Sequence, residues 1–487
     1  MNMDVVLLLG LLAPPVSATL VSLIARRRTA AAAWYCALVM LVSAGAAAAI
    51  AVRLAMGGAS VEVGRAWRLD ALSALLALLI SVVAALAVWF GPGTSSTSAS
   101  ARETRVFRIY TSLFALTMLL AVSTSNLGVM WVAIEATTVT SALLIPLRRT
   151  PAAIAASWKY LLIGSVGIAL AFTRTVLALV DYASSGADPA MALQWTTLLA
   201  AAPTLHPEVV QLAFVFLLVG FGTKAGLAPT HTWLPEAHSE APASLSAMMS
   251  GVLLAVALYA IARWKAVVDL AVGSSFTDTM LLIAGTLTVV VGATSLLSQT
   301  QYKRLLAFSS IEHVGLACFA LALGPAGVFA SLLHLTGHAL AKSVAFLLSG
   351  RIYDLYGSSD IREVPGLLAT SPSSALLFMA TMFALAGLPP FSLFVSEILI
   401  VKAAWAAGHP LLTVLVLLLI LLAFASLLVR SQFMLFGEPP SHVMRAQQGG
   451  LRLALLAAPV GLLVWVGMAL PEPLRLLLSS AAEVIRP

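Results

Sequence analysis

Residues 222–240 read GTKAGLAPTHTWLPEAHSE, and this stretch decides the predicted fold. It holds one lysine, two histidines and two glutamates, in a chain of 487 residues that is 61% hydrophobic and only 10% charged. Pro229 removes a backbone donor, so the helix that carries Lys224 is predicted to open here. Inside a membrane the freed carbonyl groups need polar partners, and water can supply them. The stretch therefore predicts a hydrated break in a membrane helix, with ionisable groups around it.

The rest of the chain predicts an all-α polytopic membrane protein. Its apolar content lies far above the roughly 45–50% of soluble chains, and apolar runs long enough to cross a bilayer recur from end to end. The basic residues are scattered between these runs, so the net charge of +7 does not indicate nucleic-acid binding. We expect a single membrane domain over residues 1–487 with fourteen spans, near residues 4–25, 30–54, 69–90, 107–125, 127–147, 153–180, 208–228, 242–264, 276–298, 304–323, 326–350, 373–406, 410–435 and 450–470.

The distribution of lysine and arginine predicts the orientation in the lipid bilayer. Loops on one side hold most of these residues, including Arg26–Arg28, Arg148, Lys303 and Arg351. Such loops face the cytoplasm by the positive-inside rule. We therefore expect a protein of the bacterial cytoplasmic (inner) membrane with both its N-terminus and its C-terminus outside.

A short internal repeat supports a second break. Residues 225–229 read AGLAP and residues 386–390 read AGLPP, and the same offset of 161 residues carries Glu236 onto Glu397. Each copy is an apolar helix, a Gly/Pro break and a second short helix with a carboxylate. Paired interrupted helices in corresponding halves are typical of inverted-repeat transporters with their site at the breaks.

Two titratable residues in the first half are candidates for proton transfer. A buried ion costs several kcal/mol unless it faces protein or water or loses its charge. Glu135 lies near the middle of the fifth span and Lys224 lies before the first break, so we expect them to partner each other across helices. A nearby carboxylate would then set the proton affinity of the lysine. The alternatives are a glutamate that only bonds Thr137 or Ser141, and a static pair that locks two helices.

Further candidates lie after the first break and in the tenth span. His231 and His238 either contribute to a proton path or are structural histidines at a loop edge. Glu312 and His313 lie inside the tenth span, while Lys303 at its inner end is either part of the path or a cytoplasmic anchor.

The eleventh span carries three titratable residues on one face. His334, His338 and Lys342 stand at i, i+4 and i+8, which places them along about 12 Å of helix. Histidine titrates near neutral pH and can both donate and accept a proton. The spacing favours a proton relay over a metal site, because lysine is a poor metal ligand. Glu397, after the second break, would continue the relay.

The sequence predicts no redox centre in this chain. Only Cys36 and Cys318 occur, so there is neither a disulfide framework nor a cysteine metal site. No Gly-rich dinucleotide motif and no haem ligation pattern is present. We expect no cofactor and no metal.

Several strings resemble the antiporter-like proton-pumping subunits of the respiratory complex I superfamily. They are WVAIE at 131–135, GTKAGLAPTHTWLPEAHSEAPASLSAMMSG at 222–251, YKRLLAFSSIEH at 302–313, HLTGHALAK at 334–342 and GLPPFSLFVSEIL at 387–399. HTWLPEAHSEAP together with SSIEHVG and FVSEI is most similar to the F-type membrane subunit of hydrogenase-4. The resemblance covers roughly residues 70–440.

The resemblance implies an architecture and a set of roles. It implies two inverted five-helix repeats, each with a broken helix, at 107–264 (helices 4–8) and 276–435 (helices 9–13); helices 1–3 precede them at 4–106, and a last helix and tail follow at 450–487. Glu135 would be the glutamate of the fifth helix and Lys224 the lysine of the broken helix. His334, His338 and Lys342 would form a central axis, with Glu397 as the exit residue.

One departure concerns the eighth span, where many such subunits carry a titratable residue. Residues 243–262 contain no His, Lys, Asp or Glu. Ser244, Ser246, Ser250, Tyr259 and water would have to bridge the two halves there.

The expected function is proton translocation within a larger membrane oxidoreductase of the hydrogenase-4 or NADH:quinone oxidoreductase type. Other membrane subunits would be the partners and would supply the redox reaction. Three alternatives remain open at this point: a subunit of a cation/proton antiporter that moves Na⁺, a subunit of an inorganic-carbon uptake system, and a structural subunit whose charges only hold helices together.

Overall fold

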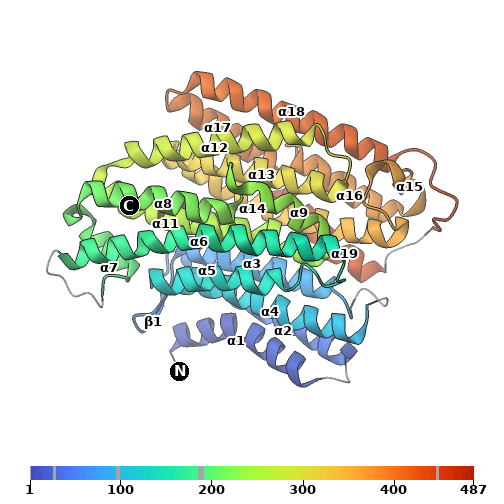
Figure 1. Ribbon diagram of the computed structural model, residues 1–487, viewed down its shortest axis with the longest axis horizontal. Helices are drawn as coiled ribbons and strands as arrows, with labels where there is room; N and C mark the ends of the chain where they lie inside the picture. The colour runs from blue at the N-terminus through green and yellow to red at the C-terminus, as the bar shows by residue number, and fades with distance from the viewer. Residues whose placement is uncertain (1, 26–28, 95–98, 185–190, 446–448, 487) are drawn as a thin grey trace.

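The computed structural model describes residues 2–25, 29–94, 99–184, 191–445 and 449–486, so Arg26–Arg28 lie outside the described residues. Most of the described chain forms long helices that lie side by side (Figure 1). The helices are α1 (Met3–Ile24), α2 (Thr29–Ala55), α3 (Ala71–Trp89), α4 (Ala101–Ser123), α5 (Leu127–Ala142), α6 (Pro151–Ser184), α7 (Trp195–Ala201), α8 (Pro207–Ala225), α9 (Trp233–Glu240), α10 (Ala243–Met248), α11 (Leu254–Val272), α12 (Ser274–Leu296), α13 (Tyr302–Leu321), α14 (Gly324–Tyr356), α15 (Leu367–Thr370), α16 (Pro372–Leu385), α17 (Ser392–Ala406), α18 (Pro410–Leu435), α19 (Gly450–Met468) and α20 (Glu472–Ile485).

The remaining elements are short. Three are 3₁₀ turns and one, η4, is a π-helical turn: η2 (Ala202–Thr204), η3 (Thr230–Thr232), η4 (Met249–Leu253) and η5 (Ile361–Glu363). A two-stranded antiparallel hairpin, β1 (Val61–Val63) with β2 (Trp67–Leu69), connects α2 to α3.

The prediction of an all-α polytopic membrane fold is confirmed. Twelve helical segments are long and apolar enough to cross a membrane, and the shorter apolar helices α5 and α16 add two more. These fourteen segments match the predicted spans in order. The eighth span runs further than predicted, to Val272, because Lys265 and Asp269 in its last turns pair with each other and so extend the helix beyond the apolar run.

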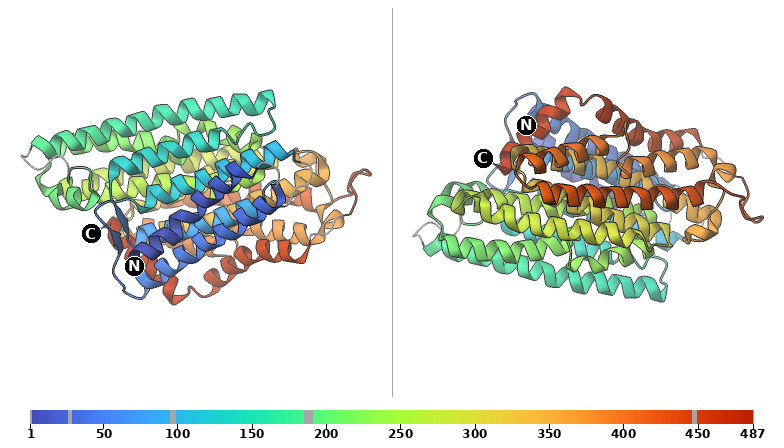
Figure 2. Two further views of the ribbon diagram at one scale, coloured as in Figure 1. Left: turned by 90° about the horizontal axis from the view of Figure 1, so that it is seen from below. Right: turned by 90° about the horizontal axis from the view of Figure 1, so that it is seen from above.

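The helices that carry most of the titratable residues lie in the middle of the bundle. The most apolar stretches of the α10–α11 segment and of α14 are buried throughout. Helices α1, α2, α18 and α19 keep a large exposed apolar face, and Figure 2 shows α1 and α18 on the outside of the bundle. Charged groups on α13 and α14 are therefore shielded by several layers of helix.

Two helices are broken at the positions that the internal repeat predicts. Helix α8 ends at Ala225 and is followed by Gly226 at φ +78°, before α9 resumes the crossing. Helix α16 ends at Leu385, and Gly387 at φ +66° precedes α17. Glycine adopts positive φ without the cost that a side chain would impose. Gly226 and Gly387 are 161 residues apart, so the two breaks share both the offset and the backbone conformation.

Candidate functional site

Lys224 is held by hydroxyl groups on two neighbouring helices. It lies in the last turn of α8, beside the first break, and is 1% exposed. Its Nζ atom donates to Thr138 Oγ1 on α5 and to Tyr160 Oη on α6, both at 2.7 Å. The Tyr160 hydroxyl in turn lies 2.8 Å from Ser141 Oγ.

Glu135 reaches Lys224 through Thr138. Thr138 Oγ1 donates to Glu135 Oε2 at 3.2 Å, and Ser165 Oγ donates to Glu135 Oε1 at 2.9 Å. The described residues contain no direct ion pair between Glu135 and Lys224. The expected partnership across helices is thus relayed by one hydroxyl. The sequence gives no signal for Thr138, because a threonine in a membrane helix commonly bonds only its own backbone.

The residues after the first break divide into two environments. Glu236 forms an ion pair of 2.6 Å with Lys159 on α6, and both side chains are about 40% exposed. His231 on η3 is partly buried. His238 on α9 is fully buried and stacks on Phe346 of α14, with 5.0 Å between ring centroids. Neither ring nitrogen of His238 has a hydrogen-bond partner among the described residues.

His238 lies where the eighth span leaves a gap in the titratable groups. It is within electrostatic range of Lys342, Lys303 and His338, which belong to the second half of the chain. Ser246 Oγ donates to the His238 carbonyl at 3.1 Å.

The serines of the eighth span meet the second half, but its tyrosine does not. Ser250 Oγ lies 2.7 Å from Ser310 Oγ of α13, in the π-helical turn η4. Tyr259 instead bonds Ser73 Oγ on α3 at 3.1 Å, and this contact explains why it does not bridge the halves as expected.

The second half places three histidines in contact. His313 Nδ1 on α13 lies 3.1 Å from His334 Nε2 on α14, and the centroid of the His338 ring lies 5.4 Å from that of the His313 ring. Lys342 is fully buried, and its Nζ donates to the Leu306 carbonyl at 2.8 Å. No carboxylate forms an ion pair with Lys342 among the described residues, and Glu312 acts on it only from a distance.

Two buried carboxylates flank the histidines. Glu312 Oε2 lies 3.6 Å from His313 Nδ1. Glu397 on α17 is 7% exposed and packs against Gly387 of the second break, where an added Cβ would collide with its carboxylate. One ligand atom each from His313, His334 and Glu397 lies within 4.8 Å of the other two, which is close enough for a shared cation. Although Glu236 corresponds to Glu397 in the repeat, only Glu397 is buried in the axis.

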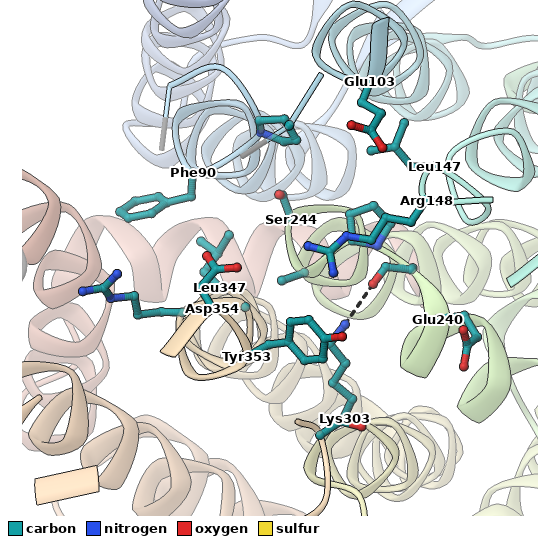
Figure 3. A pocket seen from close by; sticks show the side chains of 18 of the residues that line it. Phe90, Glu103, Leu147, Arg148, Glu240, Ser244, Lys303, Leu347, Tyr353 and Asp354 are labelled. Atoms are coloured by element: carbon teal, nitrogen blue, oxygen red, sulfur yellow. Dashed lines mark hydrogen bonds between the residues drawn. The ribbon is translucent and has the colours of Figure 1, made fainter. Parts of the chain in front are cut away.

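A polar cavity of about 580 Å³ opens beside this axis (Figure 3). Lys303, Arg148 and Asp354 converge on it, and Lys303 Nζ donates to the Ala241 carbonyl just after α9 at 3.1 Å. Leu347 of α14 also lines the cavity, and Lys342 lies five residues earlier on the same helix, about 7.5 Å of helix rise. The basic residues around the cavity come from loops that the sequence assigns to one side.

A separate set of buried charges forms direct ion pairs. Both terminal nitrogens of Arg263 donate to the Asp70 carboxylate at 2.6 Å, and Lys265 Nζ lies 2.8 Å from Asp278 Oδ1. Burial acts to raise the pKa of Asp70, but the charge of Arg263 outweighs it, and the pKa lies below its usual value. Counted by sequence, these basic residues belong to an outer loop; instead they lock helix ends together.

Arg174 is another basic residue that the structure places differently from expectation. As a membrane-interface anchor it would reach the surface, but it is buried against the Trp264 ring.

Comparisons with known proteins place these features in a family context. The family described as the transmembrane part of NADH:quinone oxidoreductase and Mrp antiporters matches residues 124–423. The chain is 38% identical over 323 residues to the hydrogenase-4 component F homolog of Methylacidiphilum infernorum (isolate V4), covering 66% of this chain and 68% of the relative. It is 27% identical over 428 residues to a Na(+)/H(+) antiporter subunit of Alkalihalophilus pseudofirmus, covering 86% of this chain and 83% of that relative.

A solved structure supports the same fold. A chain of the membrane-bound sulfane sulfur reductase, an archaeal respiratory membrane complex, superposes with a TM-score of 0.87 at 25% identity, covering 100% of this chain and 98% of that chain.

Proposed function

Because the chain belongs to the family of NADH:quinone oxidoreductase and Mrp antiporter membrane subunits, we propose that it translocates protons within a larger, redox-driven membrane complex. The hydrogenase-4 name of one relative and the respiratory complex of the solved neighbour support a redox partner. The driving reaction would occur in other subunits, since this chain has only two isolated cysteines.

One observation carries the proposal: the central lysines lack a carboxylate partner among the described residues. Lys224 bonds two hydroxyls and Lys342 bonds a backbone carbonyl. Charges that only hold helices together form direct ion pairs, as Arg263 does with Asp70 in the same chain. A buried ammonium without a counter-ion is strongly destabilised in its charged form, so it can release its proton when its surroundings change. This arrangement suits transfer better than adhesion.

The proposed path crosses both halves of the bundle. Glu135, Thr138 and Lys224 carry the proton in the first repeat, 107–264. His238 passes it to Lys342 of the second repeat, 276–435. Thus a histidine beside the eighth span replaces the titratable residue that this span lacks.

The end of the path would pass from Lys342 through His338, His334 and His313 to Glu397. Glu312, within electrostatic range of both Lys342 and Glu397, would tune their charge. The cavity beside Lys303 would admit water from the cytoplasmic side. The chain would lie in a bacterial cytoplasmic membrane with both termini outside.

Energy would reach this path through contacts with partner subunits. A conformational change that separates Glu135 from Thr138 would alter the proton affinity of Lys224, and protonation of Lys224 would in return bias that conformation. Such coupling between two sites is reciprocal.

The test compares a path lysine with a locking residue in the assembled complex. We expect Lys224→Ala to abolish redox-driven proton translocation in inverted membrane vesicles while native electrophoresis shows normal assembly. Arg263→Ala should instead reduce the amount of assembled complex. If Lys224→Ala lowers assembly and leaves translocation per assembled complex unchanged, the structural role is correct and the proposal is wrong.

A second function, Na⁺/H⁺ antiport, is favoured by the likeness to the Na(+)/H(+) antiporter relative and by the position of the Glu397 carboxylate against the backbone of the second break. A carboxylate beside unwound backbone carbonyls is a typical setting for Na⁺ in transporters with broken helices. Proteoliposomes with the purified complex distinguish the two: antiport requires ²²Na⁺ uptake driven by a pH gradient, whereas proton translocation alone leaves ²²Na⁺ uptake at background.

A further inference from the structure

We propose that His313, His334 and Glu397 form a binding site for a divalent transition-metal ion of the Zn²⁺ type. The three residues lie on α13, α14 and α17, so no spacing in the sequence brings them together. One potential ligand atom from each lies within 4.8 Å of the others, and all three side chains are buried. This inference concerns metal binding and does not depend on the proposed proton transport.

The surroundings of the two histidines determine which nitrogens are free. His313 Nε2 lies 3.1 Å from the Leu385 carbonyl, which can only accept, so this nitrogen carries the hydrogen. His334 Nδ1 lies 2.9 Å from Ser396 Oγ, and the Ser396 hydroxyl itself donates to the Leu393 carbonyl at 2.8 Å. Ser396 therefore accepts from His334, whose Nδ1 also carries a hydrogen.

It follows that two bare lone pairs face each other. In neutral imidazoles with these hydrogens, His313 Nδ1 and His334 Nε2 are both acceptors, yet they lie 3.1 Å apart. Two acceptors at this distance repel each other unless an electron-pair acceptor lies between them. Two imidazole nitrogens bound to one tetrahedral Zn²⁺, at about 2.0–2.1 Å each, stand roughly 3.4 Å apart, close to the distance seen here.

The outer contacts match those that support metal ligands. A ligating histidine usually donates its other ring nitrogen to a carbonyl, a carboxylate or water, which fixes the ring and its tautomer. The Leu385 carbonyl and Ser396 Oγ do this for the two rings.

A carboxylate completes the ligand set. Glu397 supplies an oxygen and one negative charge, and two histidines with one carboxylate are a ligand set that Zn²⁺ accepts, with a further position open. Gly387 leaves room for this carboxylate, because any Cβ there would collide with it. The nearest cation on α14, Lys342, is eight residues from His334, about 12 Å of helix rise. If the proposed proton path is correct, a bound metal would interrupt it between His334 and Glu397.

Metal binding to the full chain tests the site. The chain, purified with a tag free of histidine, is stripped with a chelator and dialysed against Zn²⁺ until the buried site has equilibrated. Bound zinc is then measured by mass spectrometry, and Co²⁺ is used for visible spectroscopy. His442→Asn, at a histidine far along the chain and outside the axis, is the control.

We expect one Zn²⁺ per wild-type chain and per His442→Asn chain, with a Co²⁺ spectrum of low coordination number. His313→Asn, His334→Asn and Glu397→Gln should lose this equivalent, and Ser396→Ala should weaken it by about 10–100-fold. Ser396→Ala keeps all three ligands and so remains informative if a ligand variant fails to fold. Equal zinc binding by all variants would indicate adventitious surface binding, and this result or the absence of zinc on the wild-type chain would overturn the proposal.

Discussion

Replacing Thr138 by valine removes the one hydroxyl that joins Glu135 to Lys224 while keeping the shape of the side chain. Lys224 then loses the 2.7 Å bond to Thr138 and keeps only the bond to Tyr160. A hydrogen bond to a charged group contributes about 1.5–3 kcal/mol. If about 2 kcal/mol of that is lost from the transfer step, the rate falls about 30-fold, at 1.36 kcal/mol per factor of ten.

The matched control is the neighbouring residue. Thr137 is equally buried, but its hydroxyl bonds only the Ile134 carbonyl of its own helix. We expect Thr137→Val to translocate protons at nearly the wild-type rate in inverted vesicles. Thr138→Val should fall about 30-fold at equal amounts of assembled complex. Equal rates in the two variants would refute the relay through Thr138.

Three further predictions concern other parts of the axis. Gly387→Ala should stop translocation by displacing Glu397, whereas Gly408→Ala, at a similar positive φ but with open space around it, should be tolerated; equal effects would show that backbone strain alone matters. Arg263→Met should lower the free energy of unfolding by about 3–5 kcal/mol, because it leaves the Asp70 charge buried and unpaired. Because the pKa of Asp70 lies below its usual value, the pair stabilises the chain above about pH 4 and loses this effect as pH falls further, so the melting temperatures of wild type and Arg263→Met should converge in acid. His238→Phe, which retains the stacking on Phe346, should assemble normally but lose most of its proton translocation; a normal rate would exclude His238 from the path.

The sequence predicts the spans well because each element carries its own signal. Apolar length identifies a membrane helix, and the AGLAP and AGLPP strings identify the two breaks through glycines that the structure holds at positive φ. The i, i+4, i+8 spacing of His334, His338 and Lys342 likewise depends only on helix geometry.

Contacts between helices are what the sequence does not contain. Thr138, Tyr160 and Ser396 act on titratable residues of other helices, and hydroxyl residues in apolar helices occur for many reasons. The repeat maps Glu236 onto Glu397, but Lys159 draws Glu236 to the surface of the bundle. The direct contact of His313 with His334 also depends on how α13 and α14 pack, which no local pattern specifies.

The central claim is that protons pass through the buried titratable residues, and Lys342→Met tests it most directly. Methionine fills the space of a fully buried lysine without a charge, and the bond to the Leu306 carbonyl is the one hydrogen bond of this side chain found among the described residues. The measurement is the number of protons translocated per turnover of the driving reaction in membranes with normally assembled complex. We predict that this ratio falls by the share that this subunit carries, while an unchanged ratio would contradict the account.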